Sequence, residues 1–177
     1  MKKPFAYNLD EAITTSNGLY IARENFSITE DTILPDGTVF KKGKKFFTMS
    51  ELLLLKNAGK FPKGWDIPNG GELIDIAREF GTKNGIRHPH YLIASLGLEL
   101  EGTLLNGENF DEYNKDPLHG DYYVMSSNNA GYYLGISVDG ISTYMLFIND
   151  HEDGFYVAKC KYSAIGSIRL VFRDFSN

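Results

Sequence analysis

The spacing of apolar residues changes near Gly97, and this change constrains the fold more than any other feature of the sequence. Before it, residues such as Leu73, Ile76 and Phe80 recur at helical spacing, which predicts a helix over residues 69–80. After it, short apolar segments alternate with turns rich in Asn, Asp and Gly, residues that tolerate positive φ. Helices in the middle of a chain, followed by a run of antiparallel strands, are typical of an α+β fold.

Two more helices are predicted. Thr48 and Glu51 have the spacing of a capping box ahead of a helix over residues 52–58. A third helix is predicted from Pro89 to Gly97, since proline suits the first helical turn and glycine suits the position after the last. Residues 18–48 have the pattern of short strands with tight turns. The strands predicted after Gly97 are Leu98–Leu105, Asp121–Ser126, Tyr132–Val138, Ser142–Ile148, Phe155–Lys161 and Ser167–Phe172.

Composition excludes several classes of protein. The 177 residues suit one domain, and 42% hydrophobic residues suffice for a packed core rather than a disordered chain. The net charge is −5, and the densest basic run, residues 41–45, surrounds a glycine and is expected to be a solvated turn. We therefore expect no nucleic-acid partner.

Cys160 is the only cysteine, which excludes an intrachain disulfide and a Cys-x-x-Cys zinc site. No signal peptide is visible after Met1, and no apolar run approaches the roughly 20 residues that span a bilayer. We therefore expect no membrane insertion. A function outside the cell would require lysis, an unusual export route or incorporation into a particle.

Three groups of residues are candidate sites. His88 and His90 flank a proline and are expected to be exposed at a helix start rather than to bind metal. Residues 149–154 are rich in oxygen ligands, but their spacing does not match an EF-hand, so an acidic hairpin loop is expected. The acidic residues of 111–116 are expected to face solvent rather than to act as a glycosidase pair. No metal, cofactor or catalytic residue is predicted.

Three segments resemble a known family. Residues 64–68, Gly-Trp-Asp-Ile-Pro, resemble the Gly-Trp-x-[Ile/Leu]-Pro opening of the FISUMP domain (Fibrobacter succinogenes major paralogous domain). Residues 120–127 are similar to the family's Tyr-Trp-Ser-Ser segment, with Met125 in place of Trp. Residues 167–173 resemble its closing strand, with Leu170 in place of Cys. The residues that carry the resemblance are Gly64, Trp65, Pro68, Glu72, Tyr123, Ser126, Ser127 and Arg169.

The resemblance implies a C-type-lectin-like fold, in which two or three short helices pack on curved, mainly antiparallel sheets and the loops present a binding face. It covers residues 61–177 and leaves residues 1–60 as a β-rich segment for attachment or assembly. From the residues themselves, we expect Trp65 to be a core ring at the start of a helix. We expect Arg169 to pair with a carboxylate.

The predicted binding face runs from Phe110 to Tyr156, where Tyr offers a rigid ring with a hydroxyl and Asn offers a donor and an acceptor. An alternative places the strand tyrosines of this segment in the core. The residues predicted as ligand contacts are Tyr113, Asn114, Asn128, Asn129, Tyr132, Tyr144 and Asp150.

These observations favour a non-enzymatic binding protein displayed on a phage virion, as a head, tail-fibre or decoration protein. Its predicted partners are a host-surface glycan or protein and other virion proteins, with homo-oligomeric assembly through the N-terminal segment. One alternative is an adhesion or pilus-associated protein on a bacterial surface. Another is a divergent enzyme of the formylglycine-generating fold, although such enzymes use two cysteines and this chain has one.

Overall fold

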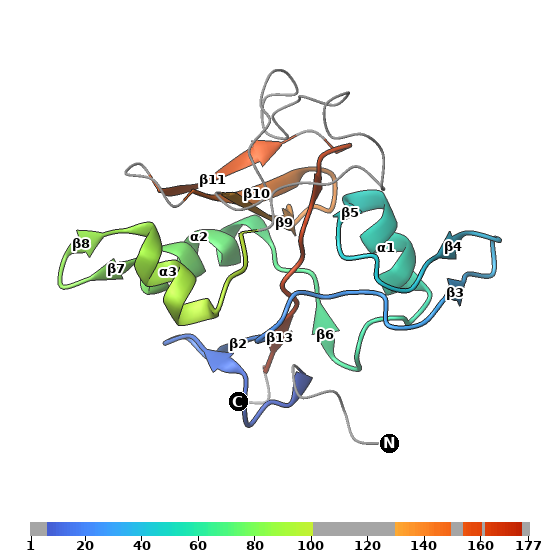
Figure 1. Cartoon of the computed structure of the whole chain (residues 1–177), viewed down its shortest axis with the longest axis horizontal. Helices are drawn as coiled ribbons and strands as arrows, with labels where there is room; N and C mark the ends of the chain where they lie inside the picture. The colour runs from blue at the N-terminus through green and yellow to red at the C-terminus, as the bar shows by residue number, and fades with distance from the viewer. Residues whose placement is uncertain (1–6, 101–129, 150–153, 161, 175–177) are drawn as a thin grey trace.

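The computed structural model describes residues 7–100, 130–149, 154–160 and 162–174, and it has an α+β architecture (Figure 1). Three helices accompany several small antiparallel sheets in this described part of the chain. The elements are β1 (Ile13–Thr14), β2 (Leu19–Ile21), β3 (Thr32–Ile33), β4 (Val39–Phe40), β5 (Phe47–Thr48), α1 (Met49–Asn57), β6 (Trp65–Asp66), α2 (Gly70–Phe80), β7 (Thr82–Lys83), β8 (Ile86–Arg87), α3 (Pro89–Leu96), β9 (Ala130–Ile136), β10 (Thr143–Asn149), β11 (Phe155–Cys160), β12 (Ile165–Gly166) and β13 (Val171–Arg173).

The three predicted helices are confirmed, because each carries its own start and stop signals. α1 and α2 both begin with complete capping boxes, Thr48 with Glu51 and Asn69 with Glu72. α3 begins with a proline in its first turn and ends at Gly97 in the left-handed conformation.

The largest sheet has the order β11-β10-β9 and is antiparallel throughout. Its strands are the predicted ones, shifted by one or two residues at their ends. One face packs on α2 and α3, where Leu73 and Leu92 lie with Leu146 and Ile148 in one buried cluster. The other face contributes Leu134 and Met145 to a second cluster with α1. The sheet therefore packs on α2 and α3 with one face, which Figure 1 shows beneath it, and shares a core cluster with α1 on the other.

A second sheet joins elements that are far apart in the sequence. Its order is β1-β2-β13-β6, so the last strand, β13, lies between β2 and β6 (Figure 1). β5 likewise pairs with β12. Strands and core side chains from both sides of the predicted boundary at residue 60 share the same sheets and clusters.

The predicted strand over residues 167–172 is only partly correct. In this part of the chain only β12 and β13 form strand pairs. Residues 168–170, called the crossing segment below, run from the β5–β12 sheet to the β1-β2-β13-β6 sheet. The carbonyls of Ile168 and Leu170 accept hydrogen bonds from Phe26 N and Ala22 N, at 2.9 Å each. The predicted strand that starts at Leu98 has no strand pairing over residues 98–100, and the rest of it lies outside the described residues, as does Asp121–Ser126.

Candidate functional site

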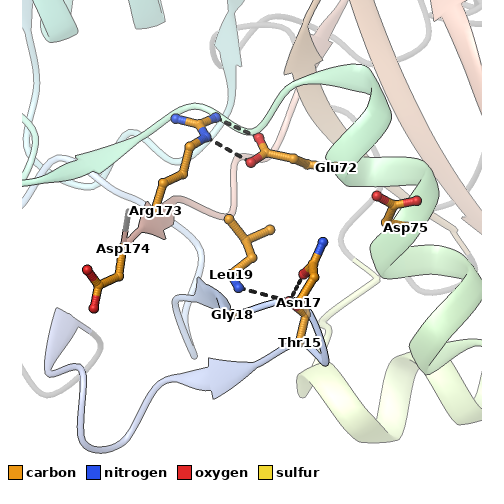
Figure 2. A pocket seen from close by; sticks show the side chains of 8 residues that line it. All are labelled: Thr15, Asn17, Gly18, Leu19, Glu72, Asp75, Arg173 and Asp174. Carbon is orange, nitrogen blue, oxygen red and sulfur yellow. Dashed lines mark hydrogen bonds and ion pairs between the residues drawn. The ribbon is translucent and has the colours of Figure 1, made fainter. Parts of the chain in front are cut away.

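Two of the hollows in the described surface each have an arginine from the end of the chain in their wall. The first, of about 120 Å³, lies between the β1–β2 turn and α2 (Figure 2). Arg173 and Glu72 pair with each other in its wall, with Nε to Oε2 at 2.8 Å and Nη2 to Oε1 at 2.6 Å. Glu72 also closes the capping box of α2 by accepting from Asn69 N at 2.8 Å.

The contacts of Arg173 extend beyond this hollow into an ion-pair network. Arg173 Nη1 donates to Asp66 Oδ2 at 2.8 Å, and Lys56 Nζ lies 2.9 Å from Asp66 Oδ1. Burial raises the pKa of Asp66, but hydrogen bonds from Lys56, the Ile67 N–H and Arg173 outweigh it and hold that pKa below its usual value. Hydrogen bonding to Glu72 raises the pKa of Arg173.

These contacts make the first hollow a junction between elements. Arg173 directs four of its five N–H donors to α2, β6 and the Ile67 carbonyl, and its charge is paired with Glu72 and Asp66, so it has little left to offer a ligand. Thr15 donates to Asn17 and accepts from Leu19 N at 2.9 Å, which fixes the β1–β2 turn beside it (Figure 2). At about 120 Å³ the space is also small compared with ligand pockets, which run from about 300 Å³.

The second hollow is an open cavity of about 330 Å³ beside Arg169, within the range of small-molecule sites. It lies where the segment after β2, the end of α3 and the crossing segment meet. Three basic and two acidic side chains contribute to its wall, so the lining carries net positive charge. The residues that line it are Arg23, Glu24, Asn25, Ser27, Lys45, Gly97, Glu99 and Arg169.

Arg169 is only 6% exposed, and it bonds to neutral oxygens. Its Nη1 donates to Leu96 O at 2.6 Å and to Ala22 O at 3.0 Å. Its Nε donates to Asn25 Oδ1 at 3.0 Å, and Nη2 makes a longer contact of 3.4 Å to Gly97 O. Burial lowers the pKa of Arg169. The predicted carboxylate partner is therefore wrong for the described residues: Arg169 caps the C-terminal carbonyls of α3.

Asn25 extends this network to the central sheet. Its Nδ2 lies 3.5 Å from the hydroxyl of Tyr133 on β9, and that hydroxyl donates to Glu99 O at 3.1 Å. The cavity wall is thus held by residues from separate parts of the chain, so its polar groups are fixed in place before any ligand arrives.

The described residues of the family resemblance gather around β6 and β13. Trp65 is a core ring, as predicted, and it packs edge-on against Tyr7 and Phe172 with centroids 5.4 and 5.8 Å away. Gly64 sits against the ring of Phe172, and Pro68 O accepts from Ile136 N at 2.9 Å. Gly64, Trp65 and Pro68 join sheet and helix and line neither cavity, whereas Glu72 lines the first hollow and Arg169 lines the second. Tyr123, Ser126 and Ser127 lie outside the described residues.

The structure corrects one predicted ligand contact. Tyr132 is 1% exposed and packs on Phe147, so its ring belongs to the core. Tyr144 is half-buried and its ring lies against Gly70 of α2. The alternative that placed these strand tyrosines in the core describes them better. The remaining predicted contacts, Tyr113, Asn114, Asn128, Asn129 and Asp150, lie outside the described residues.

Among the side chains considered for metal binding or catalysis, His88 and Cys160 occupy structural positions. His88 is the N-cap of α3 and accepts from His90 N at 3.1 Å. Cys160 is half-buried on β11, and burial raises the pKa of its thiol to about 12, which disfavours the reactive thiolate. Within the described parts of the chain, no three His, Cys, Asp or Glu side chains are placed to hold a metal.

Arg23, Asn25 and Ser27 of the Arg169 cavity were not predicted from the sequence. Their segment, Arg-Glu-Asn-Phe-Ser, follows a strand and carries no motif. The one available signal was Arg169 between two apolar residues, which indicated a buried cation without indicating its partners.

Comparison of the chain with family models, curated proteins and solved structures finds no match. Among the described residues, no helix is both long and apolar enough to cross a membrane.

Proposed function

We propose that this chain is a non-enzymatic binding protein with a C-type-lectin-like fold, displayed on a phage particle and contacting a host-surface glycan or protein. The observation that carries the proposal is the Arg169 cavity. It has the volume of a ligand site, and its polar lining is fixed by hydrogen bonds among distant segments. A prearranged pocket of this kind suits recognition, because little side-chain entropy is lost when a ligand enters.

The arrangement of elements supports the fold part of the proposal. Short helices pack on small antiparallel sheets, as the FISUMP resemblance implies, and Gly64, Trp65, Pro68 and Glu72 lie together at the junction of α2 with the sheets. Particle labelling is the direct test of display on a virion.

Two measurements test the proposal. Labelled full-length protein is applied to arrays of bacterial surface glycans and to intact bacterial cells, and immunogold microscopy is applied to particles from the producing culture. We expect saturable binding to a defined glycan or cell type and gold on particles. Gold on bacterial cells instead would favour the adhesion protein. Failure of both binding and particle labelling would contradict the proposal.

A further inference from the structure

The Arg169 guanidinium retains a hydrogen-bonding group that the described part of the chain does not use. A guanidinium has five N–H donors. The contacts of Arg169 engage Nε once, Nη1 twice and Nη2 once, and the Nη2 contact to Gly97 O is long at 3.4 Å. An N–H of Nη2 is therefore left without an acceptor among the described residues, in a side chain that lines the cavity.

The charge of Arg169 is also incompletely balanced. Its acceptors are three carbonyls and one amide oxygen, and within the described residues no carboxylate lies within ion-pair distance of it. Arginine keeps its proton under all ordinary conditions, and a buried cation without an anionic partner costs free energy. An anion that enters the cavity would meet this cation at a partly buried wall, where the attraction is stronger than in bulk water.

Arg23 supplies a second guanidinium to the same cavity. Its Nε donates to Glu11 O, while both Nη groups have no partner among the described residues. Ser27 adds a hydroxyl to the wall. The remaining Nη2 N–H of Arg169, the two Nη groups of Arg23 and the Ser27 hydroxyl together form a set of donors for the two oxygens of a carboxylate.

We infer that the Arg169 cavity binds a small ligand through a carboxylate group, between the Nη2 group of Arg169 and the side chain of Arg23. This inference rests on the proposed function only in taking the cavity as the ligand site. The carboxylate belongs to an acidic sugar or to the C-terminus of a peptide, since both present the same group and both fit about 330 Å³. Glu24 and Glu99 stand on the wall and oppose anion binding, so the ligand is a monoanion rather than a multiply charged phosphate.

The test uses full-length protein labelled with ¹⁵N-arginine and follows the arginine Nε–H resonances. The probes are sodium glucuronate, N-acetylneuraminate and an acetylated dipeptide with a free C-terminus. The controls are glucuronamide, the amidated dipeptide, and sodium chloride at matched ionic strength. We expect the carboxylates to shift the resonances of Arg169 and Arg23 saturably and the controls to leave them unchanged. The tighter of sugar and peptide identifies the source.

Substitutions of the two charged residues Arg23 and Glu24 should change the affinity for carboxylates in opposite directions. Arg23→Gln removes an exposed cation and should weaken carboxylate binding about tenfold. Glu24→Gln removes a repulsive charge and should strengthen it by about two- to fivefold. Arg78→Gln, an exposed arginine on α2 that does not line the cavity, should change nothing. These variants leave Arg169 in place, so they do not depend on a substitution that removes the cap of α3.

The outcomes separate the inference from the proposed function. Equal shifts with chloride, or no shift with any carboxylate at millimolar concentration, would overturn the inference. So would host-surface binding that Arg23→Gln and free carboxylates leave unchanged, although the proposed function would then survive. Carboxylate binding at Arg169 without any surface binding would contradict the proposed function and leave the inference standing.

Discussion

Gly64, at the junction of β6 and β13, has no room for a larger side chain. Its φ is +86°, and a Cβ at this position would lie 2.4 Å from Cε2 of Phe172. The Phe172 ring is itself confined between Trp65 and Tyr20. A side chain at position 64 therefore meets both an unfavourable backbone conformation and a ring that cannot easily move.

Gly64→Ala should destabilise the protein by about 2–4 kcal/mol, because strain at positive φ adds to overpacking. Gly18 is a matched control, since its φ is +87° and a Cβ there would meet no described atom within 4 Å. Gly18→Ala should cost about 1–2 kcal/mol from backbone strain alone. Urea denaturation of both variants gives the comparison. Equal losses would mean that the Phe172 ring moves aside.

At the residue scale, the burial of side chains could be predicted from the sequence more accurately than their contact partners. Trp65 and Cys160 could be assigned to half-buried or buried strand positions from their apolar neighbours. The partners of Arg169 could not, because Ala22, Asn25 and Leu96 reach it only through the crossing of distant segments. Local patterning specifies burial, whereas contact partners depend on topology.

Glu72 serves two elements at once, as the N3 residue of α2 and as the partner of Arg173 on β13. Glu72→Gln keeps the capping hydrogen bond but loses the charge, so it should cost about 1.5–3 kcal/mol. Glu51 is the matched control, because it is the N3 residue of α1 and faces Lys44 at 3.2 Å. Glu51→Gln should cost less, about 1 kcal/mol, because Lys44 offers Glu51 a single ammonium group whereas Arg173 makes two parallel hydrogen bonds to Glu72. Thermal and urea unfolding measure both, and equal costs would contradict a special role for the Arg173 pair.

The lowered pKa of Asp66 makes the stability of the same junction depend on pH. Its folded pKa lies below the unfolded value, so the folded state binds fewer protons and gains stability above about pH 4. That gain is lost as pH falls through the folded pKa. The difference in unfolding free energy between the wild type and Asp66→Asn should therefore be constant near neutral pH and shrink in acid. A difference that persists unchanged in acid would show that Asp66 is not the titrating group.

At the element scale, helices were predictable and short strands were not. α1 and α2 are specified by capping boxes that act within four residues. β12 and β13 hold two and three residues, and their pairing depends on β5, β2 and β6, which come much earlier in the chain. No local pattern could divide residues 165–173 into two strands and a crossing segment.

The whole molecule is organised around the return of the chain's last strands to its first ones. β13 inserts between β2 and β6, and β12 pairs with β5. Phe26, Phe40, Phe47 and Leu52 from the first part of the chain lie in one cluster with Leu134, Ile168 and Leu170 from the last. In the described structure, the parts of the chain before and after residue 60 are therefore joined through shared sheets and a shared core.

A fragment of residues 61–177 should therefore not fold on its own. It lacks β2 and β5, which leaves β13 and β12 with unpaired edges, and it exposes the apolar side chains that pack on Phe47 and Leu52, both 0% exposed in the intact chain. We expect the fragment to lose near-ultraviolet circular dichroism and cooperative urea unfolding, while retaining some far-ultraviolet helix signal from α2 and α3. The intact chain is the control. A fragment that unfolds cooperatively would show that residues 1–60 form a separable attachment segment. Much of the wall of the Arg169 cavity comes from residues 23–45, which the fragment lacks. Host-surface binding by that fragment would therefore locate recognition outside the cavity.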